Sequence, residues 1–276
     1  MGTSRRKGGV HHTVREVSFC AAAEVRTRVA LCSLHAVRRL FCLSVTSLAL
    51  LLGGVVVPAT TAASASQPSP GAQLLSDALN AAQSSGSMEF VVKTTSNKTT
   101  QTLQGVVSAP TAGETLQGGD PLEINLIDGV IYVIGSASAL ESALQITSAQ
   151  ATPYAGKWIA VHSSDAPFQL LAQDLTMAAT INQFAPQNGI RVGRTQKLGH
   201  QKVIPVVGRP SDLPKGTSGS AALFVSPKAP HLPVGGSLIL ANKTGRLSEV
   251  AVFKAWGSKV QLSTPASSTA FSTVLG

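Results

Sequence analysis

Residue types that could carry out chemistry are few and scattered in this sequence. His162, His200 and His231 lie far apart, and none has a second ligand at a metal-binding spacing. The stretch 216–220 (GTSGS) superficially resembles a nucleophile elbow, but Ser218 lacks a glycine at both of the required offsets. Histidines at strand ends or turns and a flexible Gly/Ser loop are the simpler interpretation. The sequence therefore predicts a protein that is not an enzyme and that holds no metal or cofactor.

Longer functional motifs are missing as well. The sequence contains no G-x-S-x-G, G-x-G-x-x-G, P-loop or H-E-x-x-H pattern, although it leaves a glycosidase-type pair of carboxylates open. With two Tyr and two Trp in the whole chain, stacking on nucleic-acid bases is not expected. Several basic residues fall on expected strands, where they either form a solvated face or attract anionic lipid headgroups. These are Lys93, Lys98, Arg191, Arg194, Lys197 and Lys202.

Charge and hydropathy divide the chain near residue 65. Residues 1–65 hold eight Lys/Arg and two Asp/Glu of a chain whose formal net charge is +9. A basic stretch is followed by an uncharged run over 40–57 and by small residues that lead to an A-x-A site at 63–65. We expect a secretory signal peptide removed before Ser66, with an uncleaved anchor as the alternative, because the apolar run is just long enough to span a bilayer. The protein would then be exported, either secreted or held in the cell envelope.

All three cysteines precede the expected cleavage site. They are Cys20, Cys32 and Cys42, so the exported part would have no disulfide, thiol nucleophile or thiolate metal site. Cys42 opens the apolar run, whereas the cysteine of a bacterial lipoprotein follows such a run after small residues. The sequence therefore predicts no lipid anchor.

The rest of the sequence predicts a tether, one domain and a tail. Residues 66–71 (SQPSPG) form a short Pro/Ser tether. Residues 72–265 carry one uninterrupted pattern, which is typical of a single domain. Residues 266–276 are rich in Ser, Ala and Thr, and we expect a loose tail.

Within this domain, two substantial helices and many strands are expected. Apolar spacing predicts helices over 72–83 and 167–184, the longer one apolar on most of its surface. Asp128-Gly129 favours a tight hairpin turn, and the strand after it, 130–134 (VIYVI), is apolar at every position, so both of its faces need cover. About eight to ten strands, mostly antiparallel, predict an α+β fold built on one strongly curved sheet.

Short motifs in a fixed order resemble a known family. The motifs are YAGKW at 154–158, LGH at 198–200, LPV at 232–234 and WG at 256–257. In this order they resemble the LppX/LprG type of actinobacterial cell-envelope proteins, which are related in fold to the LolA lipoprotein carriers. The resemblance covers about residues 71–265. It implies a half-barrel, a curved antiparallel sheet whose concave face is covered by helices that enclose an apolar cavity for acyl chains.

The function implied is that of a non-enzymatic carrier that holds an acylated molecule, a lipid or glycolipid, for transport in the envelope. The alternative is an interaction or regulatory module of the same fold, with a filled core, an envelope protein as partner and no lipid cargo. We expect a monomer. Members of the family typically carry a lipobox cysteine, which this sequence lacks. From the apolar pattern, the residues expected to line the cavity are Leu126, Ile131, Val133, Phe168, Leu171, Leu175 and Phe184.

Overall fold

The computed structural model describes residues 68–97, 99–211 and 213–276. The expected leader, its A-x-A site and the start of the tether lie outside the described residues. Within the described ranges, no helix is long and apolar enough to cross a bilayer.

One large sheet forms the body of the molecule. Its strands are β1 (Ser87–Ser96), β2 (Thr99–Ser108), β3 (Thr111–Gln117), β4 (Leu122–Ile127), β5 (Val130–Gly135), β6 (Ile159–Val161), β7 (Asn188–Val192), β8 (Gln196–Leu198), β9 (Gln201–Arg209), β10 (Ser218–Val225), β11 (Pro233–Asn242), β12 (Gly245–Lys254) and β13 (Thr269–Ala270). The helices are α2 (Pro70–Ser85), α3 (Ala137–Leu144), α4 (Ser148–Ala151), α5 (Phe168–Asp174), α6 (Met177–Asn182) and α7 (Phe271–Leu275), with a 3₁₀ turn η1 (Thr152–Tyr154).

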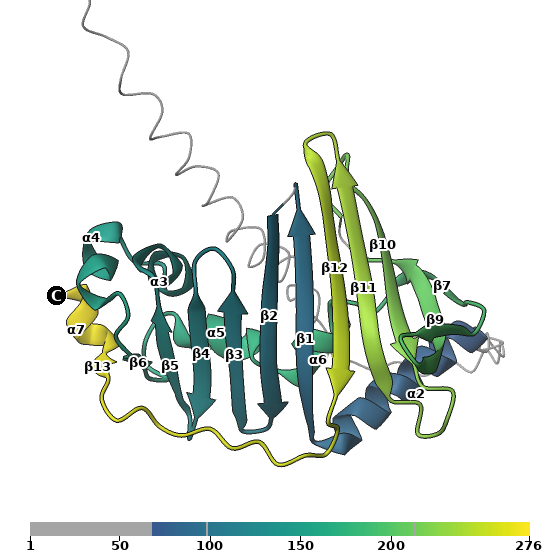
Figure 1. Ribbon diagram of the computed structural model, residues 1–276, viewed down its shortest axis with the longest axis horizontal. Coiled ribbons are helices and arrows are strands. Elements are labelled where there is room, and N and C mark those ends of the chain that lie inside the picture. Colours follow the sequence, from purple (N-terminus) through teal and green to yellow (C-terminus); the bar gives the residue numbers. More distant parts are fainter. Residues whose placement is uncertain (1–67, 98, 212) are drawn as a thin grey trace, which may run out of the picture.

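The sheet is open and almost entirely antiparallel. Its strands follow the order β13-β6-β5-β4-β3-β2-β1-β12-β11-β10-β9-β7, and β8 pairs with β9. Of the strand pairs in the described ranges, only the short β13–β6 pair is parallel. Helices α2, α5 and α6 lie behind the sheet in the view of Figure 1, on one of its faces. The predicted fold class, a curved antiparallel sheet with helices on its concave face, is confirmed.

The predicted hairpin at Asp128-Gly129 joins β4 and β5. Both residues have positive φ, 50° and 78°, as the tight turn requires. Along β5, Ile131 and Val133 are fully buried on the concave side, while Tyr132 and its neighbours on the convex side are half-buried. The apolar strand therefore follows the ordinary alternation of a sheet with one covered face.

Packing on the concave face centres on aromatic rings. Phe184, just after α6, meets Phe253 of β12 edge to face with ring centroids 6.0 Å apart, and Phe253 meets Trp256 in the same way at 6.5 Å. Phe184 also lies against Gly236 of β11, where an added Cβ would come within 2.4 Å of the Phe184 Cβ. A glycine at this position lets the ring reach the backbone of the sheet.

Two helix predictions need correction. The expected helix over 167–184 is two helices, α5 and α6, because Thr176 takes an extended backbone and its Oγ1 accepts a hydrogen bond from the Ala179 N–H at 3.1 Å. Helix α2 begins inside the expected tether, because Ser69 caps it and Pro70 occupies its first turn.

The C-terminal end also differs from expectation. Residues 258–265 form no strand and belong to an extended segment that passes the ends of the strands between β12 and β13 (Figure 1). Beyond it the expected loose tail is ordered as β13 and α7. Phe271 and Val274 of α7 are buried, and the Tyr154 hydroxyl donates to the Thr273 carbonyl at 3.2 Å. The apolar residues of the tail thus find cover against η1, α4 and β6.

We expect Gly236→Ala to lower the free energy of unfolding by about 1–3 kcal/mol, because the new methyl group overlaps the Phe184 ring. Urea denaturation measures this difference. Ser237→Ala, on the opposite face of the same strand, is the control and should stay within about 0.5 kcal/mol of the wild type. Equal stability of Gly236→Ala and the wild type would show that Phe184 does not seat there.

Phe271→Ala should lower the free energy of unfolding by about 3 kcal/mol, because it leaves a cavity between α7 and the sheet. The exposed neighbour Ser272 supplies the control, Ser272→Ala, which should change little. Thermal denaturation compares the two. A loose tail would make both substitutions equally silent.

Candidate functional site

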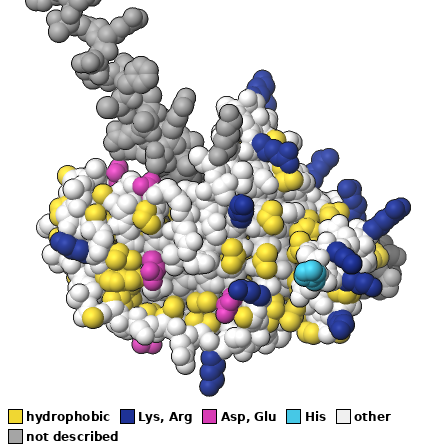
Figure 2. All heavy atoms as spheres, in the orientation of Figure 1, with side chains coloured by type: hydrophobic (Ala, Val, Ile, Leu, Met, Phe, Trp, Pro, Cys, Tyr) yellow, Lys and Arg dark blue, Asp and Glu magenta, His cyan; other side chains and the backbone are white. Residues whose placement is uncertain are grey.

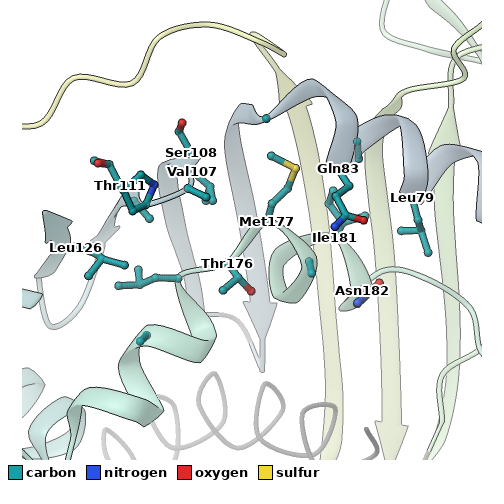
Figure 3. Close-up of a pocket in the computed structure, with 18 residues that line it drawn as sticks. Leu79, Gln83, Val107, Ser108, Thr111, Leu126, Thr176, Met177, Ile181 and Asn182 are labelled. Carbon is teal, nitrogen blue, oxygen red and sulfur yellow. The ribbon is translucent and has the colours of Figure 1, made fainter. Parts of the chain in front are cut away.

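A pocket of about 480 Å³ opens where α5 gives way to α6. Its walls come from the C-terminal half of α2, the β2–β3 turn, the end of β4 and the α5–α6 junction. Figure 3 shows Met177 between Val107 on one side and Gln83 on the other, with Leu126 at the far end. Segments distant in the sequence therefore converge on one hollow.

The lining is apolar with a few neutral polar groups. None of the described residues that line the pocket has an ionisable side chain. The polar groups are the hydroxyls and amides of Gln83, Ser108, Thr111, Thr176 and Asn182. Such a lining suits an apolar ligand, with hydrogen bonds available to a neutral part of it. It provides no nucleophile–base pair.

The helix break creates this site. Thr176 stops α5, and its Oγ1 both accepts from the Ala179 N–H and donates to the Gln173 carbonyl at 3.1 Å. A continuous helix would pass this point with a closed surface. Instead, Met177 lies at the pocket just after the break (Figure 3), and Ala178 also lines it.

The seven residues expected to line a cavity fall into three groups. Leu126 and Leu175 line the pocket. Phe168 is half-buried and packs against the core. The other four are buried in the core and do not line the pocket, namely Ile131, Val133, Leu171 and Phe184.

Sequence reasoning missed most of the wall. Leu79 and Ala82 belong to the apolar stripe of α2, which was visible in the sequence but carried no sign that part of it faces a hollow. The turn residues Ala109 and Pro110 line the opposite wall. Only the pairing of β2 with β3 and the seating of α6 bring them together.

A buried polar network fixes α6 to the sheet beside the pocket. Glu249 of β12 is 1% exposed, and its carboxylate accepts a hydrogen bond from Thr94 Oγ1 at 3.2 Å. The Gln183 side-chain amide, at the end of α6, donates to the other carboxylate oxygen. Because a buried carboxylate needs its donors, this network favours one position of α6.

The histidines are not gathered into a site. His162 Nδ1 lies 3.8 Å from Asp165 Oδ2. His231 Nδ1 is 3.0 Å from the Ser226 carbonyl oxygen, which accepts its hydrogen bond. Among the residues that the structure describes, no group of three or more His, Cys, Asp or Glu could hold a metal ion.

Gln183→Leu should lower the free energy of unfolding by about 1.5–3 kcal/mol, because the Glu249 carboxylate loses a donor while staying buried. Asn182→Leu, at the neighbouring pocket-lining position, is the control for the change of residue type. Chemical denaturation of both variants measures the effect. Indistinguishable variants would mean that the Gln183 hydrogen bond does not hold α6.

No protein-family model matches the chain, and no curated protein matches it in sequence. Solved structures resemble it at low identity. The lipoprotein LppX of Mycobacterium tuberculosis is 13% identical with a TM-score of 0.42, over 69% of this chain and 98% of LppX. MucB is 14% identical with a TM-score of 0.39, over 72% of this chain and 64% of MucB. A LolA superfamily protein of Nitrosomonas europaea is 10% identical with a TM-score of 0.25, over 66% of this chain and 90% of that protein. LppX and a LolA superfamily protein, the two types of protein that the motifs predicted, are thus among the structures that this chain resembles.

Proposed function

We propose that this protein is an exported, non-enzymatic binding protein that holds an acyl chain of a lipid or glycolipid in the pocket at the α5–α6 junction. One observation carries the proposal: a pocket of about 480 Å³ whose lining, among the residues that the structure describes, is mainly apolar and uncharged. Its volume lies within the range of small-molecule sites. Transport of the cargo within the cell envelope would follow from release at a second location.

The binding energy would come from removal of acyl surface from water. Each buried methylene group contributes about 0.8 kcal/mol, so a chain of several methylenes binds without any ion pair. Ser108, Thr111 and Asn182 at the pocket wall offer hydrogen bonds to an ester or a sugar hydroxyl. A ligand with a charged group inside the pocket would find no counter-ion there.

A second candidate function, a protein-interaction module, is favoured by a different surface. Val250 and Val252 of β12 lie on the convex face and are 44% and 45% exposed. Half-exposed Val91 of β1 pairs directly with Val252, so these side chains form a small apolar patch. Patches of this kind commonly contact other proteins.

Ala178→Trp should block cargo binding. Ala178 lines the pocket yet is exposed, so an indole ring can occupy the hollow at little cost to folding. Ala166→Trp is the matched control, because Ala166 is also exposed, precedes α5 and does not line the pocket. Native mass spectrometry of each variant recovered from an actinobacterial host, with organic extraction of the adduct, measures the bound fraction.

We expect a stoichiometric acylated adduct on the wild type and on Ala166→Trp, and its loss on Ala178→Trp. An adduct that persists on Ala178→Trp would place the cargo elsewhere. A wild type that carries nothing and takes up no added host lipid would favour the interaction module instead.

A further inference from the structure

Charge is strongly segregated along the sheet. Residues 190–276, which form β8–β13 and most of β7, carry eleven Lys/Arg and two Asp/Glu. Residues 66–189 show the reverse, with three Lys/Arg and nine Asp/Glu. In Figure 2 most Lys and Arg side chains accordingly gather toward the end of the molecule formed by β9–β12, and most Asp and Glu lie toward the other end. The molecule therefore has one basic end.

The basic end is not neutralised internally. All eleven Lys/Arg side chains of this part are exposed, and its one described acid, Glu249, is buried. Lys254 pairs with Glu89 at 3.4 Å, and within the described ranges no other of the eleven forms an ion pair. The other ten charges form no ion pair with a described acid and are available to an external anionic partner.

The arm formed by β7 and β8 concentrates this charge at the edge of the sheet. Arg191, Arg194 and Lys197 are exposed over seven consecutive residues. Between them Val192 is 43% exposed, one of the few large apolar side chains that the structure leaves open. An apolar side chain among cations suits the boundary between lipid headgroups and acyl chains.

A recess beside this arm is lined by two arginine residues. Arg191 and Arg209 contribute to a pocket of about 380 Å³ whose remaining walls include Gly189, Gly208 and Ser220. At Gly208 a Cβ would lie 2.6 Å from the Asn188 carbonyl oxygen, so only glycine allows the two strands to approach here. None of the described residues that line the recess carries a carboxylate. Guanidinium groups are well suited to phosphate, because one guanidinium can donate two parallel hydrogen bonds to two phosphate oxygens.

We propose that the basic end docks on an anionic lipid bilayer, with the Arg191–Arg209 recess receiving a phosphate headgroup. The surface of an anionic bilayer carries negative charge over its whole area, so basic residues spread over several strands and loops can all contact it. A protein partner would instead need acidic side chains at positions that match the individual basic residues. Helix α2 connects the two sites. A Cβ added at Gly71, near its start, would lie only 3.0 Å from the Arg191 Cα, so this glycine lets the helix approach the Arg191 backbone, and the C-terminal half of the helix lines the acyl pocket. Docking would use the exposed basic residues and not the residues that line the proposed cargo pocket.

The test is co-sedimentation of the protein, expressed from the full chain, with vesicles of phosphatidylcholine alone or with about 30% phosphatidylglycerol. The double variant Arg191→Gln/Arg209→Gln should bind the anionic vesicles roughly tenfold more weakly or worse. Lys93→Gln/Lys157→Gln removes the same number of exposed charges outside the basic end and should change binding less than about twofold. All variants share the same N-terminal segment, so that segment cannot account for a difference between them.

Binding of the wild type to anionic but not neutral vesicles, with this difference between the double variants, would support the proposal. Equal loss of vesicle binding in both double variants would overturn the proposal, because overall charge would then account for the binding. Equal binding of the wild type to both vesicle types would also overturn it, because anionic lipid would then not be required. Release by millimolar inorganic phosphate at constant ionic strength would assign the recess to a soluble anion instead. Self-association without vesicles, abolished by the Arg191/Arg209 change, would indicate that the acidic end of a second copy is the partner. Cargo measured by native mass spectrometry on the same variants reports the acyl pocket separately, so failure of one proposal is distinguishable from failure of the other.

Discussion

The concave face of an open sheet has to be covered by other parts of the chain, and this fold meets that requirement through the seating of Phe184 on Gly236. The ring rests on sheet backbone because no Cβ intervenes, and it continues into the aromatic contact with Phe253. One residue earlier, Gln183 donates to the buried carboxylate of Glu249. Apolar packing and a polar hydrogen bond therefore fix the same end of α6, and the position of everything that α6 lines depends on them.

A fixed α6 explains why the hollow survives beside a dense core. Protein interiors normally close small voids by shifting their elements, since each void sacrifices contacts. Here the C-terminal end of α6 is fixed to the sheet by the hydrogen bond from Gln183 to Glu249. The caps at Ser69 and Thr176 are local hydrogen bonds that set where α2 and α6 begin, and Gly86, with φ of 78°, ends α2. The link between Gln183 and Glu249 therefore opposes a shift of α6 into the space between the two helices.

Local signals predicted much of the fold and little of the site. The Asp128-Gly129 turn fixed the β4–β5 hairpin, because its positive φ values are a local requirement. The break at Thr176 was missed because the helical apolar spacing continues through it. A threonine that caps a helix through its side chain is only a weak signal in the sequence. The order of the tail at Phe271 was missed because its cover comes from α4 and β6. The large residues chosen as cavity lining, such as Leu171, are buried in the core, while small residues such as Ala178 border the hollow. Periodicity reports burial, but it does not distinguish a packed face from a lined void.

The charge distribution has a different origin from the packing. A buried acid such as Glu249 is retained by its hydrogen-bond donors, but exposed cations on β7–β12 contribute little to stability, since solvent screens them and no described acid of that end remains at the surface. The fold alone would tolerate a positively or a negatively charged side chain at the positions of Arg191 and Arg194. Repulsion among so many like charges is mildly unfavourable in the free protein, and it is relieved when an anionic surface is bound. A neutral pocket combined with a basic end therefore separates two tasks: burial of an apolar chain needs no charge, whereas approach to a charged surface needs no pocket.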